Sequence, residues 1–352
     1  MPETINVLVV DDSAFMRKII SDILQGAGDI NVAATAKNGC EALEKVKVFT
    51  PDVITLDVEM PVMDGLNCLK ELQKISDAPV IMLSSLTQSG AGATIEALES
   101  GAIDFVTKPT GLFEISGEDK KQEIIDKIRM AKSIKKRKVT AGVKAKVNKA
   151  PEVARSTDLR TIIAIGTSTG GPKALQEVIP YLPGDIPAAV LVVQHMPPGF
   201  TKSLADRLNT ISSLTVKEAE NEEVVKPGHA YIAPGDYHMT VSKAPDGTMR
   251  IILNQNPAVG GHRPAVNVMM NSLADTGFTN VIGVIMTGMG ADGSEGIMNL
   301  KRHNKGFIIS QDEKSCVVYG MPRAAVLTGV VDVVAPLKKI ANEIVKNLGV
   351  LR

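Results

Sequence analysis

Tryptophan is absent from this 352-residue chain, and aromatic residues make up only 3% of it. This scarcity argues against a stacking platform for carbohydrate or single-stranded nucleic acid. The three cysteines are odd in number and lack metal-ligand spacing, which is typical of small buried thiols in a reducing compartment. No apolar run approaches the ~18 residues that cross a bilayer, and the first residues lack the pattern of a secretory signal. We therefore expect a cytoplasmic protein that does not insert into a membrane.

The net charge is zero, but charge is strongly segregated along the chain. Residues 1–125 hold 20 acidic and 10 basic side chains (net −10), residues 126–156 hold 2 and 11 (net +9), and residues 157–352 hold 17 and 18 (net +1). At ~100 to 200 residues per domain, the length predicts two domains. We expect domains over 1–125 and 157–352, joined by a basic linker over 126–156. A basic run can bind nucleic acid, but beside an acidic segment a solvated tether is the simpler interpretation.

Four short apolar runs in the first domain each end at a polar residue. The runs cover residues 5–10, 53–56, 80–83 and 104–107. Helical stretches separate them, and this alternation predicts a doubly wound parallel sheet whose strand ends share one edge. The polar residues expected at that edge are Asp11, Asp12, Asp57, Ser84 and Lys108.

This set of side chains indicates phosphoryl chemistry. Three carboxylates suit a hard divalent ion such as Mg²⁺, while Lys108 and the Ser84 hydroxyl can contact phosphoryl oxygens. The alternative is that the acids cap the following helices. Capping could explain Asp12 or Asp57 singly, but not three acids, a hydroxyl and a lysine together.

The motifs at these strand ends resemble the receiver domain of two-component response regulators over about the first 120 residues. They are Val9-Val10-Asp11-Asp12-Ser13, Asp57 with Met60-Pro61 and Met63-Asp64-Gly65, Ser84-Ser85, and Phe105-Val106-Thr107-Lys108-Pro109. The resemblance implies that Asp57 accepts a phosphoryl group from a phosphohistidine kinase. It also implies that Asp11, Asp12, Asp57 and the Glu59 carbonyl hold Mg²⁺, that Lys108 pairs with the phosphoaspartate, and that Ser84 and Phe105 form the responding switch.

The second domain opens with another strand, glycine-rich turn and helix. The turn reads Gly166-Thr167-Ser168-Thr169-Gly170-Gly171-Pro172. The Gly-x-Ser-x-Gly spacing matches a nucleophile elbow, in which small neighbours let a serine hydroxyl stand above the sheet. A dinucleotide-binding loop is the alternative, but the G-x-G-x-x-G spacing is missing and no strand ending in an acid follows about 20 residues later.

A serine hydroxyl needs a base, and five histidines are available. His195 follows a buried apolar run over 188–193, so it is expected on the same edge as Ser168. A hydrogen-bonded core histidine is the competing interpretation. His262, in a glycine-rich loop, is the runner-up as base. Surface or turn roles suffice for His229, His238 and His303.

The base in turn needs an acid that orients it. Asp292 follows an apolar run over 281–286 and is therefore expected at the same edge. Its alternative is an ordinary Asp-Gly turn. The order Ser168, His195, Asp292 differs from the Ser, Asp, His order of α/β-hydrolases, so we do not expect that fold although the chemistry can agree.

The whole chain resembles the chemotaxis protein-glutamate methylesterase (CheB) family. Besides the receiver motifs, the resemblance rests on Gly166 to Gly171, Val193-Gln194-His195-Met196, Ala233-Pro234-Gly235, Thr287 to Gly293, and Val318-Tyr319-Gly320-Met321-Pro322. It implies a flavodoxin-like receiver followed by a Rossmann-like α/β domain, both with doubly wound parallel sheets. One departure is that the family usually carries Ser and Asp where Ala265 and Asn267 stand.

The activity implied is hydrolysis of glutamate γ-methyl esters on chemoreceptors, with release of methanol, and deamidation of certain glutamines. The resemblance also implies a chemotaxis histidine kinase as phosphodonor, activation by phosphorylation, and an oxyanion contact from the Met289 backbone N–H. The second domain needs no cofactor for this chemistry. A DNA-binding output domain and a nucleotide-dependent oxidoreductase are the rivals, but residues 157–352 are too uncharged for the first and lack the loop of the second.

Overall fold

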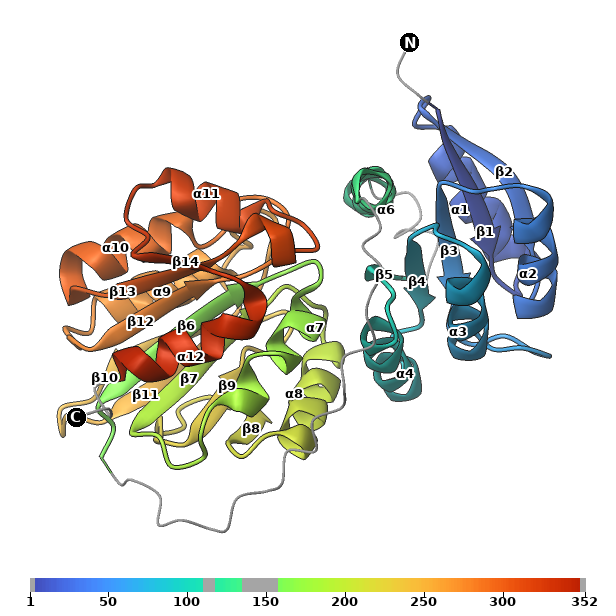
Figure 1. Cartoon of the computed structure of the whole chain (residues 1–352). Coiled ribbons are helices and arrows are strands. Elements are labelled where there is room, and N and C mark those ends of the chain that lie inside the picture. Colours follow the sequence, from blue (N-terminus) through green and yellow to red (C-terminus); the bar gives the residue numbers. More distant parts are fainter. Residues whose placement is uncertain (1–3, 110–117, 135–157, 349–352) are drawn as a thin grey trace. The chain divides into compact units, whose positions relative to one another are not determined.

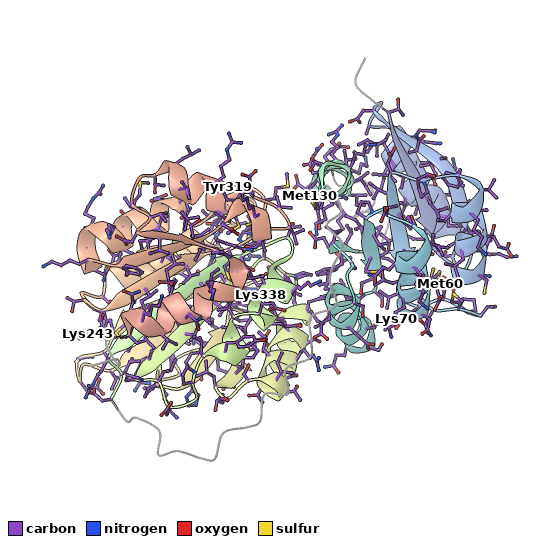
Figure 2. The ribbon with its side chains drawn as sticks, viewed as in Figure 1. Met60, Lys70, Met130, Lys243, Tyr319 and Lys338 are labelled. Carbon is purple, nitrogen blue, oxygen red and sulfur yellow. The ribbon has the colours of Figure 1, made fainter. Side chains whose placement is uncertain are left out.

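A computed structural model describes residues 4–109, 118–134 and 158–348, in two compact units, Met1–Val143 and Lys144–Arg352 (Figure 1). Most of the predicted linker, residues 135–156, lies outside the described residues, as does residue 157. In the described ranges, no helix is long and apolar enough to span a membrane. Figure 2 shows Met60 and Met130 in the first unit, and Tyr319 and Lys338 in the second.

The first unit contains a five-stranded parallel sheet with the strand order β2-β1-β3-β4-β5. Its strands are β1 (Ile5–Val10), β2 (Ile30–Ala36), β3 (Val53–Asp57), β4 (Val80–Ser84) and β5 (Asp104–Thr107). Its helices are α1 (Ala14–Gln25), α2 (Gly39–Val48), α3 (Gly65–Ile75), α4 (Gln88–Glu99) and α6 (Glu118–Ser133). The predicted domain boundary at residue 125 falls inside α6, whose buried Ile124 and Ile128 belong to this unit's core. The exact boundaries stay a prediction.

The helices after the first four strands of this sheet begin at capping side chains. These caps are Ser13 for α1, Asn38 for α2, Asp64 for α3 and Thr87 for α4, and each accepts a backbone N–H of the first turn. Asp12 and Asp57 are not among them. Helix capping therefore does not account for the acids at the strand ends.

The second unit contains a seven-stranded parallel sheet with the order β14-β13-β12-β6-β7-β9-β8, and a separate antiparallel pair, β10-β11. The strands are β6 (Thr161–Thr167), β7 (Ala188–Gln194), β8 (Thr215–Glu218), β9 (His229–Ile232), β10 (His238–Lys243), β11 (Met249–Asn254), β12 (Val281–Ile285), β13 (Phe307–Gln311) and β14 (Val333–Ala335). The helices are α7 (Gly171–Gln176), η1 (Ile179–Tyr181), α8 (Phe200–Ile211), α9 (Val266–Ala274), α10 (Ser294–Asn304), η2 (Glu313–Ser315), α11 (Met321–Leu327) and α12 (Leu337–Asn347).

The strand order places the predicted site residues where such sheets bind ligands. In the second sheet the chain runs outward from β6 through β7, then returns to the other side of β6 as β12. In the first sheet the same reversal occurs between β1 and β3. Loops at the carboxyl ends of the strands diverge at such a switch point and leave a crevice. The predicted fold class, two doubly wound parallel α/β sheets, is confirmed.

Candidate active site

Ser168 follows the last residue of β6 at the carboxyl edge of the second sheet. Its backbone N–H donates to the Thr287 carbonyl (3.0 Å), which ties the loop after β6 to the loop after β12. A Cβ atom built on Gly288 would lie 2.8 Å from the Ser168 Cβ atom. Glycine at position 288 therefore allows the second loop to pass directly beside the serine.

His195 and Asp292 form a hydrogen-bonded pair. His195 Nε2 lies 2.8 Å from Asp292 Oδ2, and the two side chains are only 6% and 9% exposed. Asp292 also accepts the backbone N–H groups of Val266 (2.7 Å) and Asn267 (2.9 Å), which open α9. Burial by itself raises the pKa of Asp292, but the bond to His195 and these N–H groups hold its pKa below the usual value. The carboxylate is therefore an ionised acceptor at neutral pH.

The departures at positions 265 and 267 have a structural explanation. Ala265 is the N-cap of α9 and makes no capping bond through its side chain. Asp292 instead accepts the first two N–H groups of the helix, and that of Asn267 is one that a capping serine could serve. The Asn267 side-chain oxygen accepts the N–H groups of Gly293 and Gly296, both at 2.9 Å. An amide oxygen thus holds the loop that carries Asp292 without placing a second charge next to that carboxylate.

His262, the runner-up base, lies against the face of His195. The two imidazole rings stack with their centroids 3.8 Å apart and their planes at 14°. The carboxylate bond of Asp292 goes to His195, so the geometry favours His195 as the base. Sequence reasoning did not anticipate the stacking, since a glycine-rich loop gives no signal about which ring it will cover.

The remaining histidines lie elsewhere. His229 Nδ1 is 2.9 Å from the Pro227 carbonyl, and His238 Nε2 is 3.1 Å from the Pro257 carbonyl. His303 is exposed in the last turn of α10. A surface role fits His303, whereas His229 begins β9 and is partly buried. A turn or surface role is wrong for His238, which begins β10 and is only 1% exposed.

Met289 follows Gly288 in the loop beside Ser168. Its side chain is 46% exposed, and within the described ranges the structure records no acceptor for its backbone N–H. A free N–H near the serine is what an oxyanion contact requires. Among the same residues, no hydrogen bond joins Ser168 Oγ to His195, as is common in enzymes without substrate.

In the first unit, Lys108 joins two of the predicted acids. Its Nζ lies 2.8 Å from Asp11 Oδ2 and 2.6 Å from Asp57 Oδ2, and both carboxylates are buried. Ligand atoms of Asp11, Asp12 and Asp57 all lie within 4.8 Å of one another. Three carboxylates at one point fit a hard divalent cation such as Mg²⁺.

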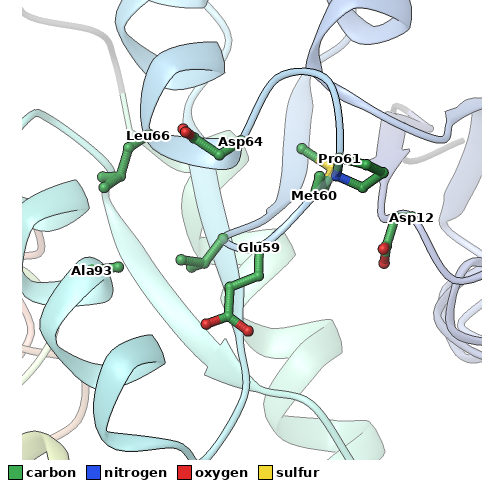
Figure 3. A pocket seen from close by; sticks show the side chains of 8 residues that line it. Asp12, Glu59, Met60, Pro61, Asp64, Leu66 and Ala93 are labelled. Carbon is green, nitrogen blue, oxygen red and sulfur yellow. The ribbon is translucent and has the colours of Figure 1, made fainter.

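A hollow of about 500 Å³ opens beside these acids (Figure 3). It is lined by Asp12, Val58, Glu59, Met60, Pro61, Asp64, Leu66 and Ala93. The Glu59 backbone N–H lies 3.3 Å from Asp57 Oδ1, which places the start of the loop after β3 next to the acid cluster. The cluster is therefore reachable from outside although Asp57 itself is buried.

The two predicted switch residues are both held inside the first unit. The Ser84 hydroxyl accepts a bond from Thr94 Oγ1 (2.7 Å) and donates to the Gly90 carbonyl (3.3 Å), both in α4. Phe105 is 5% exposed, and the Lys127 ammonium of α6 lies 5.3 Å from its ring centroid. Within the described ranges, no recorded contact joins either side chain to Asp57.

Replacing Asp57 by asparagine is expected to stabilise the first unit by about 1 to 3 kcal/mol at pH 7. Burial raises the pKa of Asp57 to about 6, against the attraction of Lys108 and with a contribution from Asp11. The folded state thus binds a proton more tightly than the unfolded state, whose value is 3.8. Protonation of Asp57 therefore stabilises the folded state fully below pH 3.8, and this stabilisation is lost as pH rises through about 6. An asparagine side chain stays uncharged at every pH, so the variant has no charge to bury.

Urea unfolding in magnesium-free buffer would measure this difference at pH 7 and at pH 3.5. The difference between variant and wild type should be largest at pH 7 and should shrink at pH 3.5. Asp22→Asn is the matched control, because Asp22 is an exposed partner of Lys18. A lower stability of Asp57→Asn than of wild type at pH 7 would contradict the prediction.

Comparisons with known proteins agree with the two units. Residues 7–117 match the family described as response regulator receiver domain, and residues 163–344 match CheB methylesterase. A protein of Pyrococcus horikoshii named protein-glutamate methylesterase/protein-glutamine glutaminase is 48% identical, over 100% of this chain and 96% of its own length. The Thermotoga maritima protein of that name is 45% identical over 97% and 98%.

A solved structure supports the fold of the second unit. The catalytic domain of the Thermotoga maritima CheB methylesterase is 45% identical, with a TM-score of 0.51, over 53% of this chain and 97% of its own length. Family model, full-length relatives and structure thus agree with each other. The chain therefore belongs to the CheB methylesterase family, in which a response regulator receiver domain precedes a methylesterase domain.

Proposed function

We propose that this protein is a serine hydrolase that removes methyl groups from glutamate γ-methyl esters of chemoreceptors and deamidates certain receptor glutamines. Phosphorylation of its receiver domain activates it. The observation that carries the proposal is the His195–Asp292 pair at the switch point of the second sheet, beside the loop of Ser168. Its place of action is the cytoplasm, and nucleic acid has no part in it.

Ser168 acts as the nucleophile. Its Oγ attacks the γ-carbonyl carbon of the methylated glutamate while His195 takes the hydroxyl proton. The tetrahedral intermediate then collapses, the bond to the methoxy oxygen breaks, and His195 returns the proton to that oxygen. Methanol leaves, and the glutamate side chain remains as an ester of Ser168. With a glutamine substrate the same steps release ammonia.

The basic nitrogen of His195 is Nδ1. An ionised Asp292 can only accept, so the bond at 2.8 Å requires that Nε2 carries the proton. Nδ1 is then the free base. It is buried and has no hydrogen-bond partner within the described part of the chain. A buried nitrogen without a partner is costly, and the Ser168 hydroxyl is the group that would satisfy it when substrate arrives.

The backbone N–H of Met289 stabilises the negative charge on the carbonyl oxygen in both tetrahedral intermediates. A contact of this kind is commonly worth ~3 kcal/mol of the barrier. In the second half of the reaction, His195 removes a proton from water, which attacks the acyl-enzyme. The second tetrahedral intermediate collapses, the bond from the acyl carbon to Ser168 Oγ breaks, and His195 returns the proton to that oxygen. The products are the glutamate carboxylate and free Ser168.

Asp57 is the acceptor of the phosphoryl group from a chemotaxis histidine kinase. One carboxylate oxygen forms the bond to phosphorus as the bond from phosphorus to the kinase histidine breaks. Asp11, Asp12, Asp57 and the Glu59 carbonyl would hold Mg²⁺, which would supply positive charge near the phosphoryl oxygens. Lys108, which already contacts Asp57, adds a second cation. Ser84 and Phe105 then leave the contacts described above and form the activated state.

Methanol release from methylated chemoreceptors tests the proposal directly. The full-length chain should release methanol, and more of it when Mg²⁺ and a small-molecule phosphodonor are added. Receptors carrying glutamine at the same sites should release ammonia. Absence of both products with the folded chain and several methylated receptors would overturn the proposed activity.

A further inference from the structure

Gln194, the last residue of β7, joins the backbones of the two predicted catalytic residues. Its side-chain Nε2 donates to the Ser168 carbonyl (3.0 Å) and to the His195 carbonyl (3.2 Å). Its Oε1 accepts the hydroxyl hydrogen of Thr167. The side chain is 2% exposed. Both the nitrogen and the oxygen of this buried side-chain amide therefore make hydrogen bonds at the carboxyl edge of the sheet.

The Gln194 amide lies where the backbone hydrogen bonds between β6 and β7 end. Strands β6 and β7 pair as far as Thr167 opposite Gln194, and the His195 N–H still reaches the Thr167 carbonyl (3.2 Å). Beyond that point each chain turns into its loop, so no regular backbone bond fixes one loop against the other. The Gln194 amide supplies two bonds there, one to each loop.

The neighbouring glycine makes room for this arrangement. A Cβ atom at Gly171 would lie 1.9 Å from Gln194 Oε1 and 1.9 Å from Thr167 Oγ1. Such contacts are far below any tolerable distance, and both atoms belong to buried side chains. The Gly171 N–H also donates to the Ser168 carbonyl (2.7 Å), which therefore receives two bonds. The glycine-rich turn after β6 is thus shaped to seat the Gln194 side chain as well as to present Ser168.

We infer that Gln194 is a positioning residue for the hydrolysis, holding Ser168 and His195 at the separation that proton transfer requires. This inference rests on the proposed function. The catalytic side chains come from loops, and reacting groups displaced by about 1 Å can lose ~10²-fold in rate. Gln194 touches neither the reacting atoms nor the His195 ring through a recorded contact. Its effect passes through the two backbones.

Gln194→Met removes the amide and keeps nearly the same volume. We expect kcat to fall ~10- to 100-fold while KM changes less than ~3-fold, because the loops shift but the substrate surface stays. Asn304→Leu is the matched control. Asn304 is also fully buried, and its amide also donates to two backbone carbonyls, of Leu273 and Phe278, away from the catalytic edge. Both variants should lose thermal stability, but only Gln194→Met should lose kcat.

Gln194→Glu provides a second measurement, the pH dependence of kcat relative to wild type. A purely structural role of Gln194 would leave this pH dependence unchanged. Its carboxylate would face two carbonyl oxygens without a hydrogen to donate, whereas its protonated form would restore one donor. The ratio of variant to wild-type kcat should therefore rise as pH is lowered from 8 to 5.5. The same ratio for Asn304→Leu should stay flat. A flat ratio for Gln194→Glu would overturn the inference, even if Gln194→Met failed to fold.

Ser168→Ala, measured beside these variants, separates this inference from the proposed function. If Ser168→Ala is inactive and Gln194→Met has the kcat of wild type, Gln194 is not a positioning residue. If Ser168→Ala keeps full activity, the serine mechanism itself is wrong. Loss of kcat in Gln194→Met, together with wild-type kcat in Asn304→Leu, is the result that supports the inference.

Discussion

Replacing Ser168 or His195 by alanine is expected to lower the rate of ester hydrolysis by ~10⁵- to 10⁶-fold, since each removal disables the same proton transfer. The double variant should be hardly slower than either single variant, because the members of a triad act as one unit. Asp292→Asn should cost ~10⁴-fold, because an amide at this position can stabilise the wrong tautomer of His195. The bond from Nε2 to Asp292 is the contact that this substitution changes.

Methanol release from a methylated chemoreceptor is the measurement. Ser203→Ala and His303→Ala are the matched controls. The Ser203 hydroxyl in α8 donates to the carbonyl of Gly199, the N-cap residue of that helix, and His303 is exposed on α10. Both controls should keep wild-type rates. Full activity of either Ser168→Ala or His195→Ala would remove that residue from the mechanism, and in the second case His262, stacked on His195, would become the candidate base.

The isolated catalytic segment, residues 157–352, is expected to hydrolyse receptor esters roughly 10- to 100-fold faster than the unphosphorylated full-length chain. Under the proposed activation by phosphorylation, we expect the unphosphorylated receiver to restrain the enzyme. The coupling free energies of such systems are usually about 1 to 3 kcal/mol. The rate of ester hydrolysis by the isolated segment should also be the same with and without phosphodonor. It contains the whole seven-stranded sheet, and the structure of the corresponding Thermotoga maritima domain was solved as a catalytic domain.

Methanol release at matched enzyme concentrations, with and without phosphodonor and Mg²⁺, would measure this coupling. Asp57→Asn in the full-length chain is the second arm. It should keep the basal rate of the unphosphorylated protein and lose the response to phosphodonor. A folded segment that is slower than the unphosphorylated chain would exclude restraint by the receiver. Labelling of Asp57→Asn by phosphodonor would show that another residue accepts the phosphoryl group.

The central strands of both sheets were predictable because parallel strands covered on both faces are continuous apolar runs. Every residue of β6 and β7 is buried, and both lie where the sequence predicts a strand. The strands that the sequence did not predict individually are β2, β8, β9, β13 and β14, at or near the edges of the parallel sheets, and the antiparallel pair β10 and β11. Strand β2, for example, is buried only at Ile30 and Ala36, and the five positions between them are exposed or partly exposed. Edge strands carry a weaker apolar signal, and β8, β9 and β14 are also very short.

The sequence by itself determined which residues could meet at each catalytic edge. Strand–helix alternation brings the carboxyl ends of parallel strands together, and this alone groups Ser168, His195 and Asp292 in one unit and Asp57 with Lys108 in the other.

Only the tertiary structure decided which side chains contact one another at these edges. His195 and Asp292 are 97 positions apart, and their bond depends on the directions of two side chains that no local pattern encodes. The stacking of His262 and the bridging amide of Gln194 arise for the same reason: loops from distant segments fix them, and periodicity does not describe loops.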